Sequence, residues 1–212
     1  MEVNPIDRDK IQDLRTWFHP KDRSVYLAAN CLAYLSNGAY LSNAFIAETV
    51  LAASAASVTF SNIPQGFRHL LIYSLGRSDA VLEADTLVIR FNNDSGSNYD
   101  VQRLTAGSTT VSAAATRATA SSFIGQLEAA NSRPANFAQS SILILGYSNS
   151  AIEKSAIGTG TIFGNTDADT DLFIVTRSLR WRNTNVITSI VIVPANGPNF
   201  VTGSSFQLYG IL

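Results

Sequence analysis

The chain has 212 residues, a formal net charge of -1 and only 15% charged residues, against about 25% in typical globular domains. Ser, Thr and Asn are abundant instead, and Lys occurs only at positions 10, 21 and 154. This composition argues against an electrostatic nucleic-acid binder, and the 46% hydrophobic content excludes a disordered chain. With one cysteine and two histidines, an internal disulfide and a multi-cysteine metal site are also excluded.

The charges are concentrated at the N-terminus. Ten charged residues lie within the first 23 positions, and residues 24–67 contain no Lys or Arg. We therefore expect an N-terminal arm over residues 1–43 and a β domain over residues 44–212. Asn4 and Pro5 predict the start of a short helix in the arm. Its apolar face would pack on its own domain or dock onto another subunit, and it consists of Ile11, Leu14, Trp17 and Phe18.

No segment resembles an export signal or a membrane span. The first 23 residues carry five acidic and five basic side chains, unlike the start of a secretory signal peptide. The longest weakly polar stretch, residues 44–60, contains Glu48 and is too short to cross a bilayer as a helix. We expect a soluble product of the cytoplasm with no membrane partner.

From residue 44 onward, short runs rich in β-branched and aromatic residues alternate with Gly, Asn, Pro and Ser turns. No credible crossover helix separates these runs. The pattern predicts an all-β fold, an antiparallel β-sandwich that is jelly-roll-like. The predicted strands are 46–51, 57–60, 68–74, 86–92, 100–104, 110–116, 121–124, 140–146, 152–163, 172–179, 186–193 and 205–211.

Three of these runs carry further expectations. The Asn-rich turn at 92–98 predicts a hairpin tip that joins strand 86–91 to the strand starting near Tyr99. The continuous apolar run 186–193 favours a strand with both faces covered. The last strand, 205–211, is expected to protect an edge of its sheet.

No pattern in the sequence assembles a catalytic set, so we expect neither an enzyme nor a cofactor. Asp167, Asp169 and Asp171 imitate the start of an EF-hand loop, but Leu172 and Ser178 stand where that loop needs Gly and Glu. The three acidic residues favour a solvated loop, with cation binding in another geometry left open. The glycines from Gly158 to Gly164 lack a dinucleotide fingerprint, and we expect them at bulges or at close packing contacts in a strand. His69 is expected to be a hydrogen-bonded structural residue.

Basic residues surround one aromatic side chain near the C-terminus. Arg177, Arg180 and Arg182 flank Trp181. Such a group can pair with the acidic residues at 167–171 or with a neighbouring subunit, which we favour. The alternative is contact with a glycan, in which Trp181 stacks on a sugar ring and Arg180 and Arg182 bind its hydroxyl groups.

Three segments, residues 55–64, 85–99 and 203–211, together resemble a group of tailed-bacteriophage structural proteins. Similar modules occur as small virion proteins and at the ends of tail fibres. The resemblance spans roughly residues 45–212 and implies a virion component with a β-sandwich domain. It offers no catalytic residues to carry over, and the arm lies outside it.

The resemblance implies a homo-oligomer, with a trimer expected, that is made in the host cytoplasm and incorporated into the virion. Its partners would be capsid or tail proteins. We favour a capsid decoration or cement protein, because a fibre normally has a long repetitive shaft that residues 1–43 do not supply. The alternative is a receptor-binding module of a tail fibre or baseplate that recognises a host-surface glycan.

Overall fold

The computed structural model describes residues 43–120, 122–165 and 172–212. These residues form strands, and no helix among them is long and apolar enough to cross a membrane. The predicted arm helix lies outside the described residues. The strands are β1 (Asn43–Val50), β2 (Val58–Phe60), β3 (His69–Gly76), β4 (Ala84–Phe91), β5 (Tyr99–Gly107), β6 (Thr110–Thr119), β7 (Phe123–Glu128), β8 (Ala138–Leu145), β9 (Lys154–Ile162), β10 (Phe173–Trp181), β11 (Ile190–Pro194) and β12 (Ser205–Ile211).

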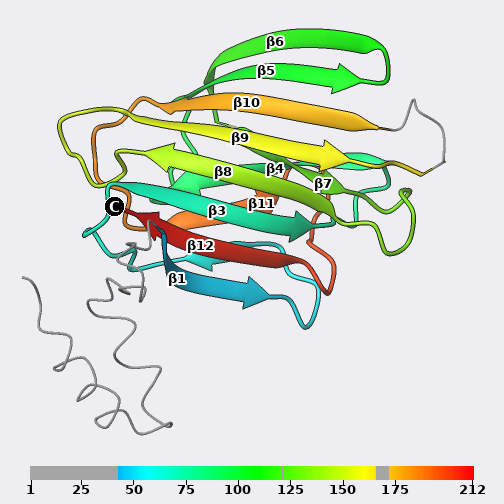
Figure 1. Cartoon of the computed structure of the whole chain (residues 1–212), viewed down its shortest axis with the longest axis horizontal. Coiled ribbons are helices and arrows are strands. Elements are labelled where there is room, and N and C mark those ends of the chain that lie inside the picture. The colour runs from blue at the N-terminus through cyan, green and yellow to red at the C-terminus, as the bar shows by residue number, and fades with distance from the viewer. Residues whose placement is uncertain (1–42, 121, 166–171) are drawn as a thin grey trace, which may run out of the picture. The chain divides into compact units, whose positions relative to one another are not determined.

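The strands form two antiparallel sheets that pack against each other (Figure 1). The large sheet has eight strands in the order β1-β12-β3-β8-β9-β10-β5-β6, and the small sheet has four in the order β2-β11-β4-β7. In Figure 1, β5 and β6 lie at the upper end of the large sheet and β1 at the lower end. The prediction of an all-β, antiparallel sandwich is confirmed.

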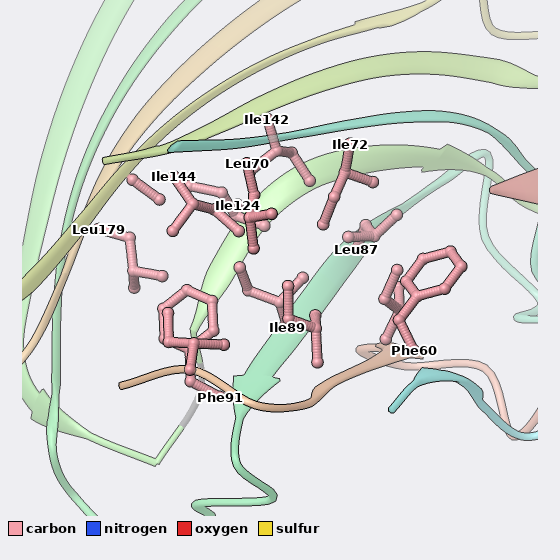
Figure 2. Packing of buried hydrophobic residues seen from close by; sticks show 14 of the residues in the cluster. Phe60, Leu70, Ile72, Leu87, Ile89, Phe91, Ile124, Ile142, Ile144 and Leu179 are labelled. Atoms are coloured by element: carbon pink, nitrogen blue, oxygen red, sulfur yellow. The ribbon is translucent and has the colours of Figure 1, made fainter. Parts of the chain in front are cut away.

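The core lies between the two sheets and follows from the two-residue period of the strands. Leu70 and Ile72 of β3 are fully buried, as are Leu87 and Ile89 of β4. Figure 2 shows these side chains pointing from both sheets into one apolar layer. Each such side chain contributes about 1.5–3 kcal/mol to folding before ordering costs.

Two glycines of β9 allow β7 to lie directly on the large sheet. A Cβ atom at Gly158 would lie 2.3 Å from the carbonyl oxygen of Ile124, and one at Gly160 would lie 2.7 Å from Ser140 Oγ. Ser140 Oγ in turn accepts a hydrogen bond of 2.9 Å from the backbone N–H of Gln126 in β7. The predicted role of these glycines in close packing is confirmed.

The turn at 92–98 connects the two sheets, so the predicted hairpin is wrong. β4 pairs with β7 and β11 in the small sheet, whereas β5 pairs with β6 and β10 in the large one. Asn92 and Asn93 have φ angles of 51° and 58°, as an Asn-rich turn favours. Alternation identifies a strand but does not identify its partner, which explains the error.

Strand β11 begins at Ile190, four residues later than predicted. The backbone N–H of Ile187 donates to the carbonyl oxygen of Tyr147, and those of Thr188 and Ser189 donate to Asn92 Oδ1. These hydrogen bonds replace the strand-to-strand hydrogen bonds that residues 187–189 would make if β11 began at 186. Only one face of β11 is fully buried, with Ile190 and Ile192 in the core, so the prediction of two covered faces is wrong as well.

Strand β12 matches its predicted range, and Phe206 and Leu208 point into the core. It lies between β1 and β3, so the prediction that the last strand closes a sheet edge is wrong. The prediction failed because β1, at the start of the domain, pairs with the other side of β12 and forms the edge of the sheet.

Candidate interaction face

The face of the large sheet that points away from the small sheet carries two rows of uncharged side chains. The register of the strands aligns them across the sheet. One row is Gln207, Tyr73, Ser141, Thr159, Thr176, Leu104 and Ala113. The other row is Tyr209, Leu71, Leu143, Ile157, Ser178, Gln102 and Ala115. We call these two rows the outer face.

None of the outer-face residues is buried, and several are large and apolar. Leu104 is 51% exposed and Ile157 is 47% exposed. Single exposed aliphatic residues are common on protein surfaces, but here they stand beside hydroxyl and amide groups with no charge between them. A broad, uncharged surface of this kind is typical of a protein–protein contact.

The sheet surface is hollowed at two places. One hollow of about 530 Å³ lies over β5, β6, β8, β9 and β10, where Gln102, Ala115, Ile157 and Ser178 contribute to its lining. A second hollow of similar volume lies towards the other end of the strands, near Ala106, Thr161 and Ile174. Both hollows are open to solvent, and the first is bordered by the charged residues Asp100, Arg117 and Arg180.

Charged side chains gather at one end of this face. Arg180 Nε lies 2.5 Å from Glu153 Oε2, and Arg180 Nη1 lies 3.4 Å from Asp100 Oδ2. Arg182 contacts both carboxylate oxygens of Asp100. Asp100 also accepts a 3.0 Å hydrogen bond from the backbone N–H of Ala118. The two arginines are thus paired within the chain by Asp100 and Glu153. The predicted partners at 167–171 lie outside the described residues.

The ionisation of Asp100 is coupled to folding. The hydrogen bond from Arg182, together with that from the Ala118 N–H, lowers the pKa of Asp100 from 3.8 to about 2. Because folding depresses this pKa, the stabilisation is present at neutral pH and is lost as the pH falls from about 4 through about 2. We expect Asp100→Asn to lose less stability than the wild type over that range, measured by chemical denaturation. An identical pH dependence in both chains would contradict this assignment.

Trp181 is part of the core and not of the surface. It is only 1% exposed and packs with Phe91 and Tyr99 at ring-centroid distances of 5.6 and 6.5 Å. Its indole N–H donates to Asp94 Oδ2 at 2.6 Å. Stacking on a sugar ring would require an exposed indole, and the indole of Trp181 is buried. Arg180 and Arg182, by contrast, are exposed.

Asp94 lies in the turn between the sheets, and its hydrogen bond from the indole of Trp181 links this turn to β10. Burial opposes ionisation of this carboxyl, but hydrogen bonds from Trp181, Asn98 and Gly96 hold its pKa below the usual value of 3.8. Tyr99 donates its hydroxyl to the backbone carbonyl of Asp94, and burial raises the pKa of Tyr99 to about 12. This network fixes the position at which the chain crosses from the small sheet to the large one.

Arg177 lies on the opposite face of β10 from Arg180. Its guanidinium is buried and donates to the carbonyl oxygen of Gly125 and to Gln126 Oε1 of β7. Burial, with a smaller effect of Arg103, lowers the pKa of Arg177 to about 10. The predicted cluster of three arginines is therefore divided between the two faces of the large sheet.

The remaining predicted sites have different outcomes. His69 Nδ1 accepts a hydrogen bond of 3.0 Å from the backbone N–H of Gly146, which confirms its structural role. Two predicted sites lie outside the described residues, so their roles stay predictions. They are the acidic loop at 167–171 and the contact residues of the arm, Ile11, Leu14, Trp17 and Phe18.

The outer face was not predicted from the sequence. The signal for it was that alternate residues within 138–163 and 172–178 are uncharged.

Comparison of the chain with protein-family models, with curated proteins and with solved structures found no match.

Proposed function

We propose that the chain is a non-enzymatic structural protein of a tailed-bacteriophage virion, and specifically a capsid decoration or cement protein. Residues 1–43 would attach the protein to the particle, and the β domain would be displayed on it. The observation that carries this proposal is the outer face, whose two rows contain no charged residue from β12 to β6. Glu48 of β1 adjoins the end of the first row, where it accepts a hydrogen bond from Gln207. Such a face suits repeated contact with protein neighbours in an assembly.

The strand order supports a jelly-roll topology, which recurs in viral capsid proteins and in lectins. When β5, β6, β9 and β10 are set aside, β1 lies beside β12, β2 beside β11, β3 beside β8 and β4 beside β7. Strands from the start of the domain thus pair with strands from its end, and successive pairs alternate between the two sheets, as they do in a jelly roll. The two additional hairpins, β5–β6 and β9–β10, would then be insertions that widen the large sheet. This fold-level analogy alone does not assign a function.

The same analogy keeps a receptor-binding module as the competing function. The residues predicted to contact a glycan do not support it, because Trp181 is buried and both Arg180 and Arg182 are paired with acidic side chains. We therefore place assembly ahead of glycan recognition.

A charge placed in the middle of the outer face tests the proposal. Ile157→Glu is expected to reduce incorporation into particles by about tenfold or more, because burying an unpaired carboxylate in a contact costs several kcal/mol. The variant should fold normally, since Ile157 is half exposed and surface changes usually alter stability by less than about 0.5 kcal/mol. Incorporation is measured by quantitative mass spectrometry of purified particles.

Thr59→Glu is the matched control, since Thr59 is an exposed strand residue of the small sheet. We expect this variant to be incorporated like the wild type. Equal incorporation of both variants would contradict a role of the outer face in assembly.

A further inference from the structure

Strand β6 forms an unusually exposed edge of the large sheet. Nine of its ten residues are exposed, and the last, Thr119, is half-buried. Figure 1 shows the strand at the upper end of the large sheet, and β5 is its one hydrogen-bonded neighbour among the strands that the structure describes. One row of backbone N–H and C=O groups along β6 therefore faces outward, and such an edge favours pairing with another strand.

The edge strands of the small sheet are protected. β2 is only three residues long, which limits pairing. At β7, the carbonyl oxygen of Gly125 accepts a hydrogen bond of 2.9 Å from Arg177, and Ser140 Oγ accepts one from the N–H of Gln126. Among the described residues, the edge formed by residues 110–116 of β6 has neither of these forms of protection.

The sequence of β6 is nearly symmetric about Ala113. Residues 110–116 read TVSAAAT, so that in an antiparallel pair of two copies Thr110 faces Thr116, Val111 faces Ala115 and Ser112 faces Ala114. None of these residues is charged or bulky. Arg117 is the first charged residue, and it stands beside Ala118, whose φ of 51° and register shift interrupt the regular strand.

The backbone directions suit the same register. The hairpin β5–β6 closes with the pair Gly107–Thr110 around a two-residue turn, and alternate residues from Thr110 onward then bond to β5. Val111, Ala113 and Ala115 consequently direct their N–H and C=O groups outward. When Ala113 faces Ala113 of a second copy, Val111 of each copy faces Ala115 of the other. The outward N–H and C=O groups of the two strands then lie opposite one another.

We propose that β6 pairs antiparallel with β6 of a second copy of this chain, about a two-fold axis at Ala113, and so joins two large sheets into one. The pairing uses the same edge of both copies and closes without leaving that edge free. It is independent of the proposed virion role, and it differs from the three-fold assembly that the family resemblance implies.

Opposite charges at position 113 test the register directly. Because Ala113 would face its own copy, A113K and A113D are each expected to place like charges together and to raise the dissociation constant of the pair by about tenfold or more. Mixing the two variants should restore pairing as a mixed species. Analytical ultracentrifugation of the full chain gives the masses, and native mass spectrometry gives the composition of the mixture.

Ala113→Ser is the matched control, because it keeps the N–H group and adds no charge, and it should retain the wild-type mass. Thermal unfolding of each variant checks that the fold is kept. The proposal is supported if both charged variants show half the wild-type mass and the mixture recovers it. A monomeric wild type, or charged variants that keep the wild-type mass, would overturn it.

Discussion

Replacement of Trp181 by alanine is expected to lower the free energy of unfolding by about 3–5 kcal/mol. The indole is 1% exposed and packs with Phe91 and Tyr99 between the two sheets. Its removal leaves a large cavity and deprives Asp94 of the hydrogen bond that ties the inter-sheet turn to β10. Urea denaturation followed by circular dichroism measures the loss.

Ser178→Ala, on the exposed face of the same strand, is the matched control and should change stability by less than about 0.5 kcal/mol. If Trp181→Ala is as stable as this control, the indole does not support the core as described. The prediction also bears on the glycan alternative. Lost binding in Trp181→Ala would reflect lost folding, whereas Arg180→Ala or Arg182→Ala would test the surface itself.

Replacement of Gly158 by alanine is expected to destabilise the domain by about 3 kcal/mol or more, at the upper end of overpacking costs. The new methyl group would lie 2.3 Å from the carbonyl oxygen of Ile124 and 2.9 Å from its Cγ1 atom. The first of these is a backbone atom, so β7 as a whole must shift. That shift would also disturb the bonds between β7 and Ser140.

Gly66→Ala provides the comparison, because a Cβ atom there would meet no atom within 4 Å. Its stability should be unchanged or should rise by about 0.4–1 kcal/mol, since the unfolded chain loses freedom. The two variants add the same methyl group, at a crowded position in β9 and at an open position between β2 and β3. Equal unfolding midpoints for both would mean that β7 does not lie on Gly158 as described.

The sequence was informative about elements and less so about their partners. Alternation located a strand near every observed position, for example at 205–211, because burial on one face repeats every two residues. It did not distinguish the sheet of β4 from that of β5, since pairing depends on residues far apart in the chain. For the same reason, Thr159 and Thr176 became neighbours on the outer face only once the register of β9 and β10 was known.

The burial of Trp181 could have been predicted. Leu179 and Trp181 alternate with Arg180 and Arg182, and in a strand this places the two apolar residues on one face and the arginines on the other. The grouping of Trp181 with the arginines rested on sequence proximity alone. The partner Asp100 could not be predicted, because it belongs to a different strand of the sheet.

The central claim is that the chain is a component of a virion, and its presence and position on purified particles test this most directly. Antibodies raised against the β domain can be used to label intact particles for electron microscopy, with quantitative mass spectrometry of the same particles. The proposed function predicts many copies per particle and labels distributed over the capsid surface. Labels confined to the tail would support the receptor-binding alternative, and particles that lack the chain would contradict a structural role in the virion.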